Sequence, residues 1–413
     1  MLQPSLIARP RYDAMLDACL DEPSIKVLSG VRRCGKSTLL LMLVRRLQSK
    51  GVPPQNILYR KLDSFDTPLE PDALWLEAQI RNALAQRRPE APFYLFLDEI
   101  QEVKGWERVI RRVHTDRIAT ICLTGSNAFL LSSDLATYLS GRYIQIPIFP
   151  LSFKEYLLFS ESTHRTEPTI EGLFARYIRY GGMPGLFESA SFEEGPVYRE
   201  LTAVHDTVIL NDVARRFELR DVDLLEKLVR YIYSTSGNLF SSRKIAGALT
   251  SAGRKTNVST IDSYLNALER AFLVSSCEQV GVAGKEVLQP LRKLYAPDTG
   301  LRNREIGFAS KDIGFQLENA VFCELQRRGY SVGVGAGKNG EVDFVATRRA
   351  DKLYIQVADT MVSEQTLERE KASLAAIGDS FPKIILTRDA LAWGTTPEGI
   401  RIQDVAGWLL EED

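Results

Sequence analysis

A glycine-rich segment near the start of the chain places the strongest constraint on its fold. Residues 30–37 read GVRRCGKS and satisfy the pattern G-x-x-x-x-G-K-[ST] at every fixed position. A short apolar run precedes the segment, at residues 24–28, and good helix formers follow it as far as Gly51. The pattern therefore predicts a buried strand, a phosphate-binding loop and a helix.

Such a loop binds a triphosphate through its backbone N–H groups, and the start of the helix favours negative charge. We expect ATP and Mg²⁺ as ligands, with Lys36 reaching the β- and γ-phosphates and Ser37 holding the metal. Cys34 suggests an oxidation-sensitive switch, with a small residue tolerated at a variable position as the alternative. The predicted nucleotide-binding residues are Gly30, Arg33, Cys34, Gly35, Lys36, Ser37 and Thr38.

The rest of the N-terminal region alternates strand candidates with helix-length stretches. Four further strands are expected at residues 56–62, 93–97, 118–123 and 143–148. This alternation predicts an α/β domain whose parallel sheet is covered by helices on both faces. We expect this first domain to span residues 1–150.

A pair of carboxylates ends the third strand candidate, in the segment FYLFLDE at residues 93–99. Asp98 would lie at the carboxyl end of the strand beside Mg²⁺, and Glu99 would polarise the water that attacks the γ-phosphate. An acidic pair after a strand is often a solvated turn. Together with the phosphate-binding loop, however, it predicts ATP hydrolysis.

Two other positions are candidate catalytic residues. Ser126 and Asn127 follow the fourth strand, and because parallel strands end at one edge, either side chain could touch the γ-phosphate or the attacking water. The alternative for Asn127 is a helix cap. Arg142 precedes the fifth strand and could stabilise charge on a nucleotide, with a plain surface arginine as its alternative.

The remainder of the chain divides into three parts by pattern. Residues 151–234 are helical in character and are broken by YGGMPG at 180–185, which predicts a helical lid. Residues 235–294 show the order helix, turn, helix and β-wing of a winged helix. Residues 295–413 alternate helix and strand candidates, which predicts a separate α/β domain.

Charge is distributed unevenly along the chain. Lys and Arg total 52 against 53 Asp and Glu, but residues 241–293 hold eight basic and four acidic residues, a net charge of +4. We expect phosphate contacts from this basic segment, with a protein-docking surface as the alternative. The DNA-binding candidates are Arg243, Lys244, Arg254, Lys255, Asn257, Ser259 and Thr260.

Five segments in this order resemble bacterial and archaeal AAA+-type ATPases with a C-terminal domain of unknown function. They are GVRRCGKST, YLFLDEIQ followed by Gly105-Trp106, LTGSNAFLLS, LSGRYIQIPIFPLSFKEY and YGGMPGL. The resemblance implies an AAA+ core with Lys36 and Ser37 in Walker A and Asp98 and Glu99 in Walker B. It also implies a sensor at Ser126 or Asn127 and an arginine finger at Arg142, which we expect to act in trans within a homo-oligomer.

The C-terminal part resembles the PD-(D/E)xK nuclease fold around Glu318, Asp343 and the strand at 354–358. In active members a helix Glu, a strand Asp and a carboxylate-x-Lys sequence hold Mg²⁺ and activate water. Here Gln356 replaces the carboxylate and Ala358 replaces the lysine. We therefore expect a restriction-endonuclease-like fold that does not hydrolyse nucleic acid.

Taken together, the sequence favours an ATPase that couples its nucleotide state to DNA binding. A signalling or scaffold ATPase whose C-terminal half binds protein is the first alternative, and an ATP-dependent nuclease is the second. Five cysteines lie far apart without zinc-ligand spacing, and no export signal or membrane span is apparent. We expect a cytoplasmic protein that does not contact a membrane.

Overall fold

The computed structural model divides into two compact units. It describes residues 6–125, 139, 141–165, 167–188, 192–215, 217, 219, 221–281, 291–307, 312–337, 340–361 and 364–411. The first unit runs to Ile148 and includes Arg270–Phe272, and the second contains the rest from Phe149 onwards. No helix within the described ranges combines the length and apolarity needed to cross a bilayer. All five cysteines are buried and unpaired.

The first unit contains a five-stranded parallel sheet in the order β2-β3-β4-β1-β5. Its strands are β1 (Ile25–Ser29), β2 (Ile57–Lys61), β3 (Tyr94–Asp98), β4 (Thr120–Gly125) and β5 (Tyr143–Pro147). All five strands predicted from the sequence are therefore present. Every residue of β1 and β3 is buried, as expected for strands with helices on both faces.

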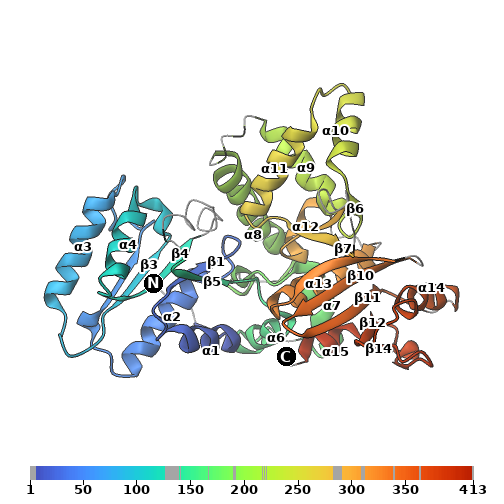
Figure 1. Ribbon diagram of the computed structural model, residues 1–413, viewed down its shortest axis with the longest axis horizontal. Helices are drawn as coiled ribbons and strands as arrows, with labels where there is room; N and C mark the ends of the chain where they lie inside the picture. Colours follow the sequence, from blue (N-terminus) through green and yellow to red (C-terminus); the bar gives the residue numbers. More distant parts are fainter. Residues whose placement is uncertain are drawn as a thin grey trace. The chain divides into compact units, whose positions relative to one another are not determined.

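Helices cover both faces of this sheet (Figure 1). They are α1 (Pro10–Cys19), α2 (Lys36–Ser49), α3 (Ala73–Gln86) and α4 (Trp106–Thr115). Helix α2 packs on β3 and β4 with α1 beside it, whereas α3 and α4 pack together over the other face. Leu95 and Leu97 of β3 belong to the apolar core under α3 and α4. Because side chains alternate along a strand, Asp98 points to the α2 face.

The second unit begins with helices. They are α6 (Phe153–Ser162), α7 (Ile170–Tyr180), η4 (Pro184–Phe187), α8 (Glu194–Thr207), η5 (Val208–Arg215) and α9 (Val222–Ser234). The break after α7 requires glycine, since Gly181 has φ 77° and a Cβ on Gly182 would lie 2.4 Å from Leu151 O. Asp298 accepts a hydrogen bond from Gly182 N at 2.6 Å and fixes the break.

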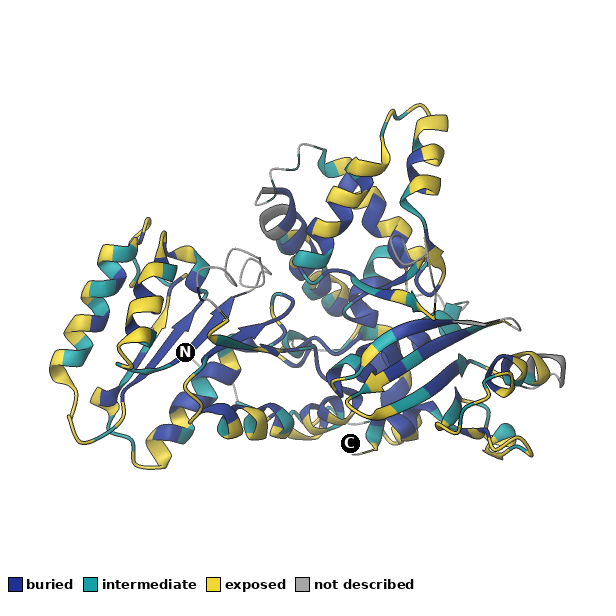
Figure 2. Ribbon diagram, viewed as in Figure 1, coloured by how far each residue is buried: buried dark blue, intermediate teal, exposed yellow. Residues whose placement is uncertain are grey.

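The remaining elements are the strands of one nine-stranded sheet and the helices between them. They are β6 (Leu239–Phe240), α10 (Ser242–Ser251), α11 (Val258–Arg270), β7 (Ser275–Val280), β8 (Arg292–Tyr295), α12 (Thr299–Ile306), α13 (Ile313–Arg327), β9 (Ser331–Gly337), β10 (Gly340–Arg348), β11 (Asp351–Ala358), α14 (Glu364–Ala375), β12 (Lys383–Thr387), β13 (Gly394–Thr395), β14 (Arg401–Asp404) and α15 (Val405–Leu410), with η8 (Ala390–Ala392) between β12 and β13. The strand order is β13-β14-β12-β11-β10-β9-β7-β8-β6. Its central strands are buried, while the outward faces of the surrounding helices are exposed (Figure 2).

One pairing in this sheet departs from the four-part division. Strand β7 pairs in parallel with β9, with Gln279 opposite Val334 and Val280 opposite Gly335. The strands of residues 235–294 and those of residues 295–413 therefore share a sheet. The boundary expected at residue 294 does not separate two sheets.

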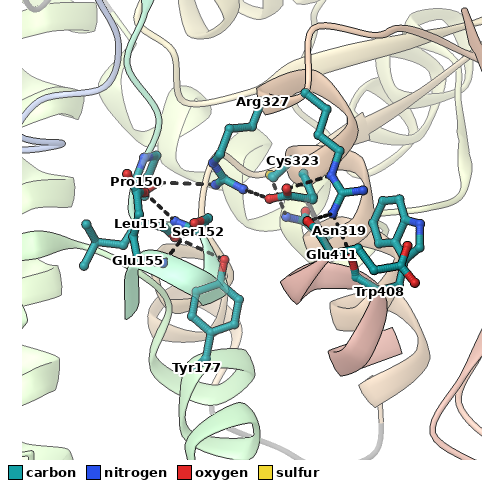
Figure 3. A network of polar contacts seen from close by, with 12 residues as sticks. Pro150, Leu151, Ser152, Glu155, Tyr177, Asn319, Cys323, Arg327, Trp408 and Glu411 are labelled. Atoms are coloured by element: carbon teal, nitrogen blue, oxygen red, sulfur yellow. Dashed lines mark hydrogen bonds and ion pairs between the residues drawn. The ribbon is translucent and has the colours of Figure 1, made fainter. Parts of the chain in front are cut away.

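A buried polar network holds the start of the second unit (Figure 3). Arg327 donates from Nη2 to Pro150 O at 3.2 Å, and its neighbour Arg328 donates to Trp408 O at 2.7 Å. Glu324 pairs with both guanidinium groups. Because charged groups need partners when buried, this network fixes the C-terminal end of α13 to residues before α6 and to α15.

Candidate functional site

The loop between β1 and α2 needs glycine at both ends. Gly30 has φ 149°, and a Cβ there would lie 2.1 Å from Ile148 O. Gly35 has φ 103° and caps the N-terminus of α2. These conformations favour glycine, and they turn backbone N–H groups and the positive end of α2 toward the loop.

Lys36 lies inside this loop. Its side chain is buried, and Nζ donates to Gly30 O at 2.9 Å and to Val31 O at 3.0 Å. Carbonyl oxygens carry only partial negative charge, so phosphate oxygens are stronger partners for the ammonium group. The loop thus holds a cation where a triphosphate would bind.

Ser37 and Asp98 meet at the carboxyl edge of the sheet, where Ser37 Oγ donates to Asp98 Oδ1 at 2.9 Å. Asp98 is fully buried, and no described residue gives its Oδ2 a hydrogen bond. Burial raises the pKa of Asp98, although hydrogen bonds from Thr124 and Ser37 oppose the shift. Burial and the nearby Asp98 also raise the pKa of Tyr59 to about 12.

This oxygen-rich, anionic corner fits Mg²⁺. Mg²⁺ prefers oxygen ligands and is usually held by one or two protein groups together with phosphates and water. The hydroxyl of Ser37 and the unsatisfied oxygen of Asp98 are such groups, and a cation would offset the cost of burying the carboxylate.

Glu99 follows directly, in a left-handed backbone conformation with φ 58° that is uncommon for a residue other than glycine. Its N–H donates to Thr124 Oγ1 at 3.0 Å, and Gln101 Nε2 donates to its carboxylate. The turn therefore directs Glu99 away from the course of β3, and two neighbours hold it there.

Arg142 lies at the opposite edge of the sheet from this loop. It precedes β5, and its carbonyl accepts a hydrogen bond from Ile25 N at the amino end of β1, while Nη1 donates to Thr115 Oγ1 at 3.1 Å. The phosphate-binding loop follows the carboxyl end of β1, so the fold does not bring Arg142 to the nucleotide site of its own chain. Ser126 and Asn127 lie outside the described residues.

Two residues of the site were missed by the sequence argument. Thr124 contacts both acidic residues, and its position at the end of β4 was an available signal. Arg9 donates from Nη1 to Cys34 O at 3.0 Å, and no spacing pattern links those two positions. The thiol-bearing side chain of Cys34 is fully buried, which argues against an oxidation switch because an oxidant needs access to the sulfur.

The DNA-binding candidates lie on α10 and α11 and the turn between them. Asn257 Oδ1 accepts from Thr260 N at 2.8 Å and caps α11. The exposed residues among these candidates are Arg243, Lys244, Lys255, Asn257 and Ser259.

Arg254 departs from the expectation of a charge available to phosphate. Its guanidinium group forms ion pairs with Asp221 and Asp223, both at the start of α9. The hydrogen bonds that Arg254 donates to the carboxylates of Asp221 and Asp223 raise the pKa of Arg254. Lys293, counted in the same basic segment, is buried in the second unit. The basic surface is therefore smaller than the sequence count of +4 implied.

The residues of the expected nuclease-like site lie close together around Lys293. Glu318 of α13 and Asp343 of β10 both contact Lys293 Nζ, and Gln356 of β11 hydrogen-bonds to Asp343 N. Ala358, at the position of the missing lysine, is buried. Across the described residues, no group of three or more His, Cys, Asp or Glu side chains is arranged to hold a metal.

Comparison with known proteins bears on both units. Residues 22–157 match a family described as an AAA domain, and residues 171–312 match a domain of unknown function. An uncharacterized protein of Haemophilus influenzae is 36% identical over 408 residues, covering 98% of this chain and 99% of the relative. An uncharacterized protein of Methanocaldococcus jannaschii is 31% identical over 367 residues, covering 86% of this chain and 79% of the relative.

A solved structure shares the fold. A Walker-type ATPase of Pyrococcus abyssi aligns with a TM-score of 0.51 and 15% sequence identity, covering 74% of this chain and 99% of that chain. At this identity the likeness concerns the fold alone.

Proposed function

The chain belongs to the family of AAA-type P-loop ATPases, and on that premise we propose that it binds ATP with Mg²⁺ and hydrolyses it. The observation that carries the proposal is the contact between Ser37 Oγ and Asp98 Oδ1 at 2.9 Å. This contact joins the phosphate-binding loop to the buried carboxylate. Lys36 directly precedes Ser37 in the sequence, and Glu99 directly follows Asp98.

Each residue has a defined part in this reaction. Lys36 exchanges its two carbonyl partners for the β- and γ-phosphates, and the N–H groups at the start of α2 bind the remaining oxygens. Ser37 and Asp98 would hold Mg²⁺, which would neutralise charge on the phosphates. Glu99 orients the attacking water and accepts its proton, while Thr124 and Gln101 keep the carboxylate in place.

Two variants test this assignment. Lys36→Ala should lose ATP binding, measured by titration with a fluorescent nucleotide, because the variant lacks the ammonium group that is held inside the loop by Gly30 O and Val31 O. Glu99→Gln should bind ATP and lower kcat by about 100-fold or more. Glu102→Gln, an exposed neighbour, is the matched control and should keep wild-type turnover. Wild-type kcat in Glu99→Gln would contradict its assignment as the base.

We further propose that Arg142 acts on the nucleotide of a neighbouring copy. Its place at the amino edge of the sheet supports action in trans, since the loop of its own chain follows the opposite ends of the strands. Mixing Arg142→Ala with Lys36→Ala protein should restore some ATPase activity, because each variant supplies what the other lacks. Mixed assemblies with no activity would contradict the proposal.

We also propose that nucleotide state is coupled to DNA binding through a winged helix formed by α10, α11, β7 and β8. The support is the order of these elements and the exposed cations Arg243, Lys244 and Lys255. Replacing all three by Ala should weaken binding to duplex DNA equally across sequences. The slope of log K against log salt should fall by roughly three phosphate contacts.

The control for this triple variant removes three exposed cations elsewhere in the second unit, Lys227, Arg388 and Arg401. It should keep DNA affinity, because the charges removed lie outside α10 and α11. Affinity should also differ with and without ATP in the wild-type protein. Equal loss of DNA affinity in both triple variants would remove the assignment to this surface.

A second candidate function is binding of a protein partner, and one loop favours it. Phe65 and Leu69 between β2 and α3 are completely exposed, beside Asp63, Asp66 and Glu70. Acidic residues repel phosphates, so this surface suits an apolar protein surface with a basic rim rather than nucleic acid. Unchanged DNA affinity in the Arg243, Lys244 and Lys255 variant would favour this candidate.

A further inference from the structure

A buried ammonium group lies at the centre of the nuclease-like fold. Lys293 Nζ, from β8, is 2.6 Å from Glu341 Oε1, 2.9 Å from Glu318 Oε1 and 3.0 Å from Asp343 Oδ1. The side chain of Lys293 is only 2% exposed. Three carboxylates from α13 and β10 thus surround one cation at ion-pair distance.

The same carboxylates include the two that the nuclease resemblance assigns to Mg²⁺, Glu318 and Asp343. The residues present do not fit a metal. The Lys293 ammonium occupies the space between the carboxylates, and Gln356, in place of the third acid, donates to Glu370 Oε2 at 2.7 Å and accepts from Asp343 N at 3.1 Å. Both polar atoms of the Gln356 amide are hydrogen-bonded to protein groups, and the amide carries no negative charge to attract a cation.

The centre is also covered by the segment between α9 and β6. A Cβ on Gly237 would lie 2.8 Å from Glu318 Oε2, so the backbone passes directly over that carboxylate. Ser236 Oγ fixes the segment by donating to Leu294 O at 3.1 Å, and Tyr295 OH donates to Glu318 Oε1 at 2.6 Å. The α9–β6 segment and the side chain of Tyr295 therefore pack directly against the carboxylate of Glu318.

We propose that the ammonium group of Lys293 is the resident cation of this centre and takes the place of a divalent metal. Its role is structural. It joins β8 to α13 and β10, and so links the β8 end of the nine-stranded sheet to its central strands. This inference is independent of the ATPase assignment, because every residue in it belongs to the second unit.

Electrostatics support a permanently charged lysine. Burial alone would lower the pKa of Lys293, but the carboxylates of Glu318, Asp343 and Glu341 together raise it. Burial and the neighbouring Asp343 raise the pKa of Glu318 to about 7, against the opposing effect of Lys293. Removing the ammonium would leave buried carboxylates uncompensated, a strongly destabilising change.

Binding of Mn²⁺, measured by isothermal titration of the full chain without nucleotide, tests the proposal. The wild-type protein should show no Mn²⁺ binding that depends on Asp343, because the site already holds a cation. Lys293→Ala should gain one such site per chain and should be stabilised by Mn²⁺. The added substitution Asp343→Asn should abolish the gain. Dependence on Asp343 in the wild-type protein, or a folded Lys293→Ala without a gain, would overturn the proposal.

Stability provides a second readout that covers a variant too unstable to titrate. Lys293→Met should lower the unfolding temperature, because the chain keeps its three carboxylates and loses their cation. Adding Glu318→Gln and Asp343→Asn should recover at least half of that loss, since few charges then remain to be compensated. If the triple variant were no more stable than Lys293→Met, charge compensation would not be the role of Lys293.

Discussion

The hydroxyl of Thr124 sets the positions of both acidic residues of the nucleotide site. It donates to Asp98 Oδ1 and accepts the hydrogen bond from Glu99 N at 3.0 Å. One side chain thereby contacts both the carboxylate that we propose as a Mg²⁺ ligand and the backbone at which Glu99 leaves β3. Such preorganisation matters because misplacing a catalytic group by about 1 Å can cost about 100-fold in rate.

We predict that Thr124→Val lowers kcat by about 10-fold or more while ATP affinity changes less. Valine keeps the shape of threonine but removes the hydroxyl. The N–H of Glu99 therefore loses its hydrogen-bond acceptor, whereas the contacts of Lys36 in the phosphate-binding loop are unchanged. Steady-state ATPase assays and nucleotide titration separate the two effects. Thr124→Ser retains the hydroxyl and serves as the control. Equal kcat in the valine and serine variants would show that the hydrogen bonds are dispensable.

Asp298 gives a prediction for pH. It is buried, and burial raises its pKa to about 6 despite hydrogen bonds from backbone N–H groups. The folded protein therefore keeps this proton between about pH 4 and pH 6, where the unfolded chain releases it. Stability falls as pH rises through this window, by up to about 3 kcal/mol.

Asp298→Asn removes this titration and imitates the protonated form. Its unfolding free energy, relative to wild type, should rise between pH 4 and pH 7, as measured by urea denaturation. Asp351→Asn, at an exposed position of the same unit, is the control and should stay parallel to the wild-type curve. A constant difference between Asp298→Asn and wild type would show that Asp298 does not titrate in this range.

At the scale of elements, the strands of the first unit could be predicted because local signals agreed. Each strand is five or six residues long, contains apolar residues and is separated from the next strand by a helix-length stretch, and these properties are visible in the sequence. Asp98 and Ser37 could be brought together for the same reason, since parallel strands end at one edge. The local sequence pattern was therefore sufficient to predict a contact wherever the two residues follow the ends of strands in one parallel sheet.

Contacts between distant segments could not be predicted in this way. The pairing of Gln279 with Val334 joins positions 55 residues apart through a register of two residue pairs, and no periodicity encodes it. Lys293 and Arg254 looked like solvated charges because their partners are remote. Glu318 lies 25 positions from Lys293, and Asp221 lies 33 positions from Arg254.

The loop before α2 yields a prediction about an element. Gly30→Ala should abolish ATP binding and lower the unfolding temperature, because the new Cβ would lie 2.1 Å from Ile148 O. Gly51→Ala is the matched control. Gly51 also has positive φ, 90°, but nothing lies within 4 Å of its Cβ position, so only backbone strain of about 1 kcal/mol is expected. Nucleotide titration and thermal unfolding measure both. Normal ATP binding by Gly30→Ala would contradict the steric argument.

At the scale of the whole molecule, the described residues of the nucleotide site all belong to the first unit. We predict two transitions in calorimetric unfolding, and we expect saturating ATP to raise the midpoint temperature of one of them. At 100 times Kd a ligand adds about 2.7 kcal/mol, or about 5–10 °C for a unit of this size. Lys36→Ala should keep both transitions and lose the shift. A single transition that moves as a whole would show that the units unfold together.

Gln356 has a consequence for how this chain can evolve. Its amide lies 2.7 Å from Glu370 Oε2, so a single change to glutamate would set two buried carboxylates against each other. That change would still leave Lys293 in the centre and alanine at position 358. A carboxylate-x-Lys sequence and an open metal position at this centre would therefore need changes at all three positions. The buried lysine therefore limits which single substitutions this centre can accept.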